Sequence, residues 1–197
     1  RFVDAARRAQ QAGFDGVELH GANGYLLDQF LQDRSNHRTD DHGGSIANRA
    51  RLLLEVTDAV AGVWGASRVG MHLAPRGDAH DMGDSDRLAT FSHVARELGK
   101  RRIAFIATRE KPGPDWIGPQ LKAAFGGTYV ANEGLDLASA NALLAAGEAD
   151  AVAFGKLFIA NPDLPRRFAT AAPLNPPDPQ TFYAAGPAGY TDYPALA

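Results

Sequence analysis

Amphipathic helices alternate with short apolar segments along almost the whole chain, and this alternation limits the fold more than any other feature. The apolar segments have the length and composition of strands that are buried on both faces of a parallel sheet. The expected strands are residues 17–19, 69–74, 103–108, 128–131 and 151–154. The expected helices are residues 2–12, 48–63, 86–100, 117–125 and 137–146, with a last helix from near residue 161. Repeated helix–strand units predict right-handed crossovers and a parallel sheet with helices outside it.

Two α/β architectures fit this alternation: a doubly wound sheet and a (β/α)8 barrel. A doubly wound sheet usually has a glycine-rich phosphate fingerprint after its first strand, and the segment HGANGY does not match it. In a barrel, the residues that perform chemistry follow the strand ends. Polar or glycine residues do so here after every strand: His20, His72, Arg109 with Glu110, Asn132 with Glu133, and Gly155 with Lys156. We therefore expect a (β/α)8 TIM barrel.

The number of strands is too small for a closed barrel. Eight strands and about 250 residues are typical of the fold, whereas this chain has 197 residues and five expected strands. We therefore expect an incomplete barrel, with three further strands before Arg1 or on a complementing chain. Residues 1–197 would form the C-terminal part of one domain, with a proline-rich tail from about residue 173.

Composition excludes several classes of partner and site. The net charge of −3 and the pI near 6.1 provide no basic patch for nucleic acid or for an anionic membrane. The sequence has no cysteine, which excludes disulfides, thiolate metal sites and cysteine nucleophiles. A cysteine-free chain also fits a cytoplasmic enzyme. We expect a small-molecule substrate and no metal.

The turn after the first strand groups three side chains that can bind or protonate a substrate. In the segment GVELHGANGYLLDQF, His20 ends the strand, and Asn23 and Tyr25 follow in the polar turn. A histidine at a strand end is more often a structural hydrogen bonder, and Tyr25 before two leucines also fits a core aromatic. Farther along, Ser45 is a good helix cap, and we assign Arg49 and Arg51 to structure.

Several stretches resemble the old yellow enzyme family of flavin-dependent ene-reductases, especially its bacterial xenobiotic-reductase branch. The most specific is HGANGYLLDQFLQDRSNHRTDDHGGSIANRARLLLEV. ELGKRRIAFIATRE, YVANEGLD, EADAVAFGKLFIANPDLPRRF and TFYAAGPAGYTDYP are also similar. The resemblance covers nearly the whole chain and implies the last five strands and the tail of an FMN-binding barrel. It also implies an oxidoreductase that uses NADPH or NADH to reduce activated alkenes and nitro compounds.

The same resemblance implies roles for individual residues. His20 and Asn23 would donate hydrogen bonds to the carbonyl or nitro oxygen of the substrate, where negative charge develops as hydride adds. Tyr25 would deliver the proton to the neighbouring carbon. The expected phosphate site comprises Asn132, Glu133 and Gly134, together with Gly155 and Lys156 after the last strand. Phe182 and Tyr183 of the tail resemble the aromatics that cover flavin and substrate.

Four positions depart from the family pattern. His72 and Lys156 stand where the family usually has arginine, Arg102 where it has glycine, and Thr108 where it has cysteine. The resemblance implies that His72 lies near the flavin, where a fixed positive charge favours the anionic reduced form, and histidine need not be charged at neutral pH. Lys156 would bind phosphate as a point charge rather than through a planar fork. Arg102 would be strained if its backbone requires a positive φ.

These departures and the missing strands leave other readings open. One is a non-catalytic fragment or degenerate paralogue that requires another chain or segment, with exposed edges on its first and last strands that favour pairing. A homo-oligomer is compatible with this reading. Another phosphate-binding barrel, such as an aldolase or isomerase, ranks last because a Schiff-base lysine at a strand end is missing: Lys156 falls in the expected phosphate turn.

Overall fold

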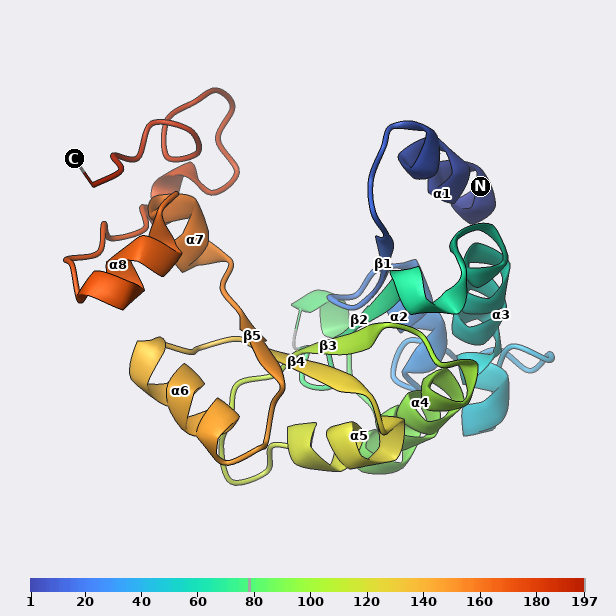
Figure 1. The fold of residues 1–197 in the computed structure, drawn as a ribbon. Coiled ribbons are helices and arrows are strands. Elements are labelled where there is room, and N and C mark those ends of the chain that lie inside the picture. Colours follow the sequence, from blue (N-terminus) through green and yellow to red (C-terminus); the bar gives the residue numbers. More distant parts are fainter. Residues whose placement is uncertain (78, 197) are drawn as a thin grey trace.

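The computed structural model describes residues 1–77 and 79–196 and contains one curved, entirely parallel sheet (Figure 1). Its five strands are adjacent in sequence order, β1-β2-β3-β4-β5. Their bounds are Val17–Gly21 for β1, Val69–Leu73 for β2, Phe105–Arg109 for β3, Thr128–Asn132 for β4 and Ala151–Ala153 for β5. Successive parallel neighbours of this kind form a consecutive segment of a β/α barrel.

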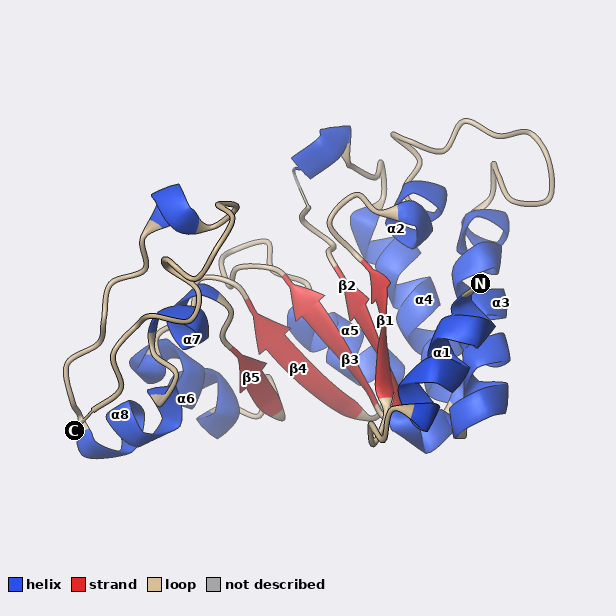
Figure 2. Ribbon diagram, turned by 90° about the horizontal axis from the view of Figure 1, so that it is seen from above, coloured by secondary structure: helices blue, strands red, loops and turns tan. Residues whose placement is uncertain are grey.

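Helices cover the outer face of the sheet, and its other face lies open in the views of Figures 1 and 2. The long helices are α1 (Phe2–Gln11), α3 (Ile46–Trp64), α4 (Arg87–Arg101), α5 (Gly118–Phe125) and α6 (Leu137–Ala145). Shorter helices are α2 (Leu26–Leu31), α7 (Lys156–Ala160) and α8 (Leu164–Thr170), with 3₁₀ turns at Ala66–Arg68, Ala79–Asp81 and Pro179–Thr181. Among the described residues, no helix is long and apolar enough to cross a membrane.

The expected alternation is confirmed, with two omissions and small shifts at element ends. The helices α2 and α7 were not predicted, because six and five residues are too few to show a helical apolar period. Strand β3 begins at Phe105 rather than at Ile103, and β1 extends through His20 to Gly21. In the tail after α8, as far as residue 196, the one regular element is the 3₁₀ turn at Pro179–Thr181.

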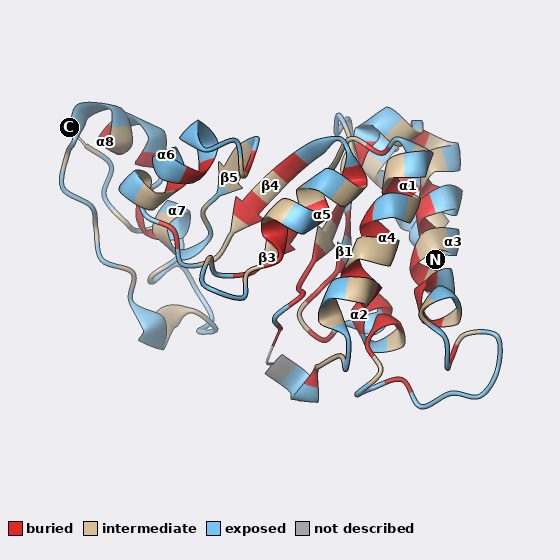
Figure 3. Ribbon diagram, turned by 90° about the horizontal axis from the view of Figure 1, so that it is seen from below, coloured by how far each residue is buried: buried red, intermediate tan, exposed pale blue. Residues whose placement is uncertain are grey.

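The strand register separates a buried face from a face that would line the barrel interior. Leu19, Met71, Ile106 and Tyr129 occupy one row of paired positions, are buried and belong to the hydrophobic core. Figure 3 shows buried segments on the strands and on the helices that cover them. Strand residues alternate between faces, so the neighbouring positions point the other way. These include the paired His20 and His72 and, one layer nearer the carboxyl ends, Arg109 beside Asn132 and Ala153.

Gly70 on β2 lies directly beneath an aromatic ring of the next strand. Gly70 pairs with Phe105, and a Cβ placed at Gly70 would come within 2.3 Å of the Phe105 ring. Such a separation is a severe clash, so glycine is required for this close packing. The Phe105 ring thereby fills the space that a side chain at position 70 would otherwise occupy.

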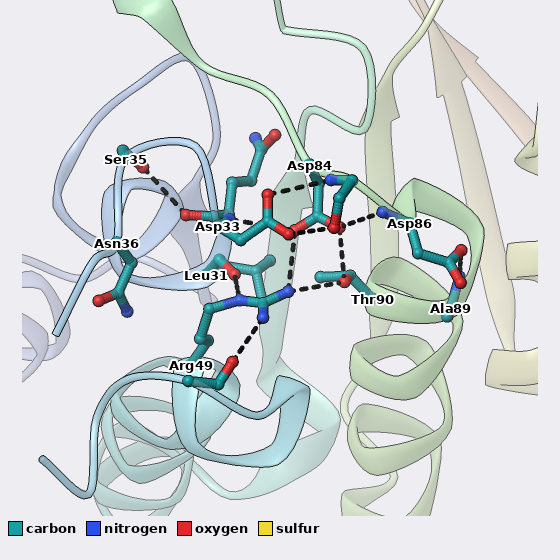
Figure 4. Close-up of polar contacts among 12 residues, drawn as sticks. Leu31, Asp33, Ser35, Asn36, Arg49, Asp84, Asp86, Ala89 and Thr90 are labelled. Carbon is teal, nitrogen blue, oxygen red and sulfur yellow. Dashed lines mark hydrogen bonds and ion pairs between the residues drawn. The ribbon is translucent and has the colours of Figure 1, made fainter. Parts of the chain in front are cut away.

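A buried arginine joins α2, α3 and the start of α4 (Figure 4). Arg49 Nε donates to Leu31 O at 2.8 Å, and its Nη2 lies 3.0 Å from Asp84 Oδ2 and 3.1 Å from Thr90 Oγ1. The expectation that Arg49 is structural is confirmed by these contacts. Arg51 donates to Asp41 O and Asn48 Oδ1, and Ser45 caps α3, both as expected.

Candidate active site

The turn that follows β1 is held in an unusual backbone conformation. Asn23 has φ 58° and Gly24 has φ 74°, values in the left-handed region. Asparagine and glycine are the residues that tolerate this region best. The buried carboxylate of Asp28 accepts the Gly24 N–H at 2.9 Å and the Gln32 side-chain N–H at 2.7 Å. The turn then ends at Tyr25, which caps α2.

Histidine and tyrosine rings cluster at this edge of the sheet. The His20 ring centroid lies 5.3 Å from that of Tyr25 and 5.4 Å from that of His72. On the far side of Tyr25, the His80 ring lies at 6.0 Å, and His80 Nδ1 is 3.0 Å from Asn23 O. The structure thus brings His20 and Tyr25 together as the sequence predicted, and it adds His80 from the loop after β2.

Burial keeps the two strand histidines neutral at neutral pH. Desolvation lowers the pKa of His20. Desolvation, with smaller contributions from His20 and the positive charge of Arg109, lowers the pKa of His72 to about 4. A neutral imidazole still donates one N–H, so His20 retains a donor for a substrate oxygen. His72 does not supply the permanent positive charge that its position usually carries in the resembled family.

A cavity of about 350 Å³ opens at the carboxyl ends of β2 to β5. It is lined by Asn23, His72, Arg109, Asn132, Glu133, Gly134, Leu135, Ala153, Phe154, Gly155, Lys156 and Leu157. The structure therefore gathers one of the three expected catalytic side chains and most of the expected cofactor-binding residues around one space. The His20 ring contacts the ring of His72, which lines the cavity, and the Tyr25 ring in turn contacts His20.

Among the described residues, two cations and one carboxylate line this cavity. Arg109 Nε donates to Glu133 Oε2 at 2.7 Å, which pairs the one acidic side chain. Lys156 begins α7 and remains as a further positive charge. Glu133 has φ 93° in a non-glycine residue, a strained conformation of the kind that often occurs at functional sites. The resulting excess of positive charge suits a phosphate-bearing ligand.

The tail contributes one aromatic to this region. Lys156 Nζ lies 6.0 Å from the centre of the Phe182 ring, at the outer limit of a cation–π contact. The neighbouring Tyr183 side chain is fully exposed. Of the two aromatics expected to cover the site, the structure places Phe182 beside an expected phosphate residue, whereas Tyr183 points into solvent.

Arg109 and His80 lie in the site but were not assigned to it from the sequence. The sequence marks Arg109 only as a polar residue after a strand. Of the residues that follow the predicted strands, Arg109 and Glu110 are the two to which no role in the site was assigned. The sequence does contain a signal for Arg109, because it ends its strand as Asn132 ends the next one. The two residues pair at the carboxyl ends of β3 and β4. His80 lies in the loop after β2 with φ 58°, and periodicity does not report on loops.

A second hollow, of about 530 Å³, lies at the opposite ends of the strands and is lined by residues such as Gly16, Glu18, Arg68 and Phe105. Glu18 and Phe105 point to the interior face, so further barrel strands would cover this hollow. In β/α barrels the amino ends of the strands serve stability, and chemistry takes place at the carboxyl ends. The smaller cavity is therefore the candidate active site.

A parallel β/α sheet whose successive strands are neighbours, with a cavity at the carboxyl ends of those strands, defines the class of β/α barrels. Comparison with known proteins narrows this class. Residues 1–175 match the model of the NADH:flavin oxidoreductase / NADH oxidase family. The chain belongs to this family, which includes the old yellow enzymes that the sequence resembles.

Relatives agree with this assignment over nearly the whole chain. 12-Oxophytodienoate reductase 1 of Oryza sativa subsp. japonica is 48% identical over 207 residues, which cover 99% of this chain and 54% of the relative. A probable flavin mononucleotide-dependent alkene reductase of Leishmania infantum is 45% identical over 201 residues, 99% of this chain and 54% of the relative. The chain thus spans about half the length of these curated relatives.

Solved structures show that the fold is part of a barrel. Morphinone reductase in complex with tetrahydroNAD superimposes with a TM-score of 0.95 at 47% identity, covering 100% of this chain and 54% of the other. An old yellow enzyme homologue from Zymomonas mobilis gives a TM-score of 0.95 at 42% identity, with coverages of 99% and 57%. The expectation of an incomplete (β/α)8 barrel is confirmed.

Proposed function

We propose that the full-length protein is a cytoplasmic, FMN-dependent ene-reductase that uses NADPH or NADH to reduce α,β-unsaturated carbonyl compounds, and nitro compounds by the same site. One observation carries the proposal. A single cavity joins Asn23 after β1 and His72 on β2 to the cationic residues Arg109, at the end of β3, and Lys156, after β5. A substrate site and a phosphate site therefore meet in one space, as a phosphorylated redox cofactor requires.

The side chains at the β4 and β5 ends fit an FMN phosphate. Lys156 provides a positive charge, while Glu133 is already neutralised by Arg109. At Gly155, a Cβ would have no neighbour within 4 Å, so the backbone is open to a ligand. We assign the phosphate to Asn132, Gly134, Gly155 and Lys156, and the tail aromatic Phe182, which lies beside Lys156, to the cover of the site. Bound FMN would supply the hydride for the substrate.

His20 and Asn23 would hold the oxygen of the substrate. Hydride addition to the β carbon moves the electron pair of the alkene toward the carbonyl, and negative charge accumulates on its oxygen. A donor that already points at this oxygen stabilises the charge without reorganisation. The neutral His20 imidazole has an N–H for this purpose, and the Asn23 amide has two.

Tyr25 would complete the reduction by protonating the α carbon. Its ring is close to that of His20, with centroids 5.3 Å apart, and 58% of the residue surface is exposed. A phenol O–H can donate a proton in this role. The net reaction adds one hydride and one proton across the double bond.

Flavin binding tests the proposal most directly. The purified full-length protein should be yellow, with the absorption of bound FMN, and should oxidise NADPH or NADH in the presence of 2-cyclohexen-1-one. Lys156→Ala should weaken FMN binding about 10-fold, the effect expected for one lost charge-assisted contact. Lys100→Ala, which removes an exposed lysine from α4, is the matched control. A colourless full-length protein that gains no flavin absorption in excess FMN would refute the proposal.

One observation favours the alternative of a flavin-binding protein without catalysis. The pKa of His72 is about 4, so this position is uncharged under cellular conditions. If no other group supplies the charge, reduction of bound flavin by a nicotinamide would be slow. Anaerobic mixing with NADPH and with NADH distinguishes the two readings: bleaching of the flavin absorption within seconds supports the enzyme, and a stable yellow spectrum supports the alternative.

A further inference from the structure

Arg109 links the two halves of the candidate site by direct contacts. It is the last residue of β3, and its side chain is one-third exposed, at 34%. Its Nη1 lies 3.0 Å from Asn23 Oδ1, and its Nε lies 2.7 Å from Glu133 Oε2. The guanidinium therefore spans from the turn after β1 to the turn after β4, residues that are far apart in the sequence.

The contact with Arg109 determines which way the Asn23 amide faces. A guanidinium group has only donors, so the atom of Asn23 that meets it must be the carbonyl oxygen. Rotating the amide by 180° would bring its NH2 group against Nη1, two donors face to face. The NH2 group is consequently directed away from the guanidinium, and Asn23 is one of the residues that line the cavity.

Glu133 keeps the guanidinium in place for this contact. The 2.7 Å bond to Nε holds one edge of the planar group, while Nη1 on the outer edge reaches Asn23. The Asn23 backbone is held separately, by its left-handed conformation and by the His80 contact to its carbonyl oxygen. Arg109 thus acts on the side-chain torsion of Asn23, which the backbone contacts leave free to rotate.

We propose that Arg109, held by Glu133, is a positioning residue that orients the Asn23 amide so that its N–H groups face the substrate oxygen. This inference rests on the proposed function for the identity of the substrate, but the orientation of the amide is a property of the chain without any ligand. Arg109 acts on the reduction step through Asn23, and its loss should therefore lower the rate of substrate reduction only while Asn23 is present.

The first test follows the Asn23 amide in FMN-free, full-length protein labelled with ¹⁵N-asparagine. The side-chain NH2 signals of Asn23 are identified by their absence from Asn23→Ala. Arg109→Gln should shift these signals, whereas Arg101→Gln should leave them in place. Arg101 is a suitable control because, like Arg109, it is a partly exposed arginine in an ion pair. Its partners are Asp58 and Glu97 on the outer helices. Unchanged Asn23 signals in Arg109→Gln would overturn the proposal, whatever the protein catalyses.

The second test is a double-mutant cycle on the reduction of 2-cyclohexen-1-one by FMN-loaded protein. Arg109→Gln should lower kcat about 10-fold with KM changed less than 3-fold, because an oriented donor contributes most as charge develops. In the Asn23→Ala background, the same change should lower kcat less than 2-fold. Equal losses in both backgrounds would contradict positioning. A full-length protein that binds no FMN defeats the proposed function, and the spectroscopic test then decides the positioning role alone.

Discussion

The carboxylate of Asp28 accepts the backbone N–H of Gly24 across 2.9 Å in a site from which solvent is excluded. This bond closes the turn that presents Asn23 and Tyr25. Burial raises the pKa of Asp28 from its ordinary value to about 6, against the opposing effect of the hydrogen bonds from Gln32 and Gly24. The conformation of the candidate catalytic turn is therefore tied to a group that titrates near neutral pH.

Replacement of Asp28 by asparagine should flatten part of the pH dependence of stability. Because the pKa is raised on folding, protonated Asp28 stabilises the native state at low pH, and this contribution is lost as pH rises through 6. The wild type should lose about 2 kcal/mol from this group between pH 4 and pH 7. Asp28→Asn has no such titration. Urea unfolding of both FMN-free, full-length proteins at the two pH values measures the difference, and parallel curves would contradict the assignment.

His72 should produce the opposite trend. Its pKa falls to about 4 in the folded state, so the unfolded chain binds more protons between that value and about 6.5, and stability decreases as pH falls. Between pH 7 and pH 5, the loss from this group is about 2 kcal/mol. His72→Gln should lose correspondingly less over the same range. Direct titration of the His72 ring by NMR provides an independent check, and a midpoint above 6 would disprove the prediction.

Arg102 occupies a position that favours glycine. It ends α4 with φ 54° and ψ 42°, a left-handed cap conformation that costs other residues about 1 kcal/mol or more. The sequence predicted that Arg102 would be strained if its φ were positive, and its φ is indeed positive. Arg102→Gly should raise the free energy of unfolding by about 1 kcal/mol. Arg102→Ala, which keeps the Cβ, should bring no such gain, and equal stability of the two variants would exclude the backbone explanation.

Arg49 should be among the most sensitive positions for stability. Its side chain and that of Asp84 are 7% and 1% exposed, and removal of the arginine leaves a buried carboxylate without its cation. Arg49→Met should cost about 3–5 kcal/mol. Arg51→Gln, two residues along the same helix and on an exposed face, should change stability by less than about 1 kcal/mol. Comparable losses in both variants would show that the helix, rather than the buried ion pair, is responsible.

Much of this fold could be predicted from periodicity because each strand is short, apolar and followed by polar residues. Since the carboxyl ends of parallel strands meet at one edge, the same pattern predicted that His72, Asn132 and Lys156 would lie near one another. The contact between Arg109 and Asn23 could not be predicted, because it joins residues 86 positions apart through two side-chain conformations. The position of His80 beside Tyr25 likewise depends on a loop backbone with φ 58°.

The packing of Phe105 over Gly70 has a consequence for how related sequences can diverge. The ring takes the volume that a side chain at position 70 would need, so the two positions share one fixed space. A larger residue at 70 requires either a smaller residue at 105 or a movement of the Phe105 ring into the hollow that it lines. Positions 70 and 105 should therefore vary as a pair among sequences that keep this barrel interior.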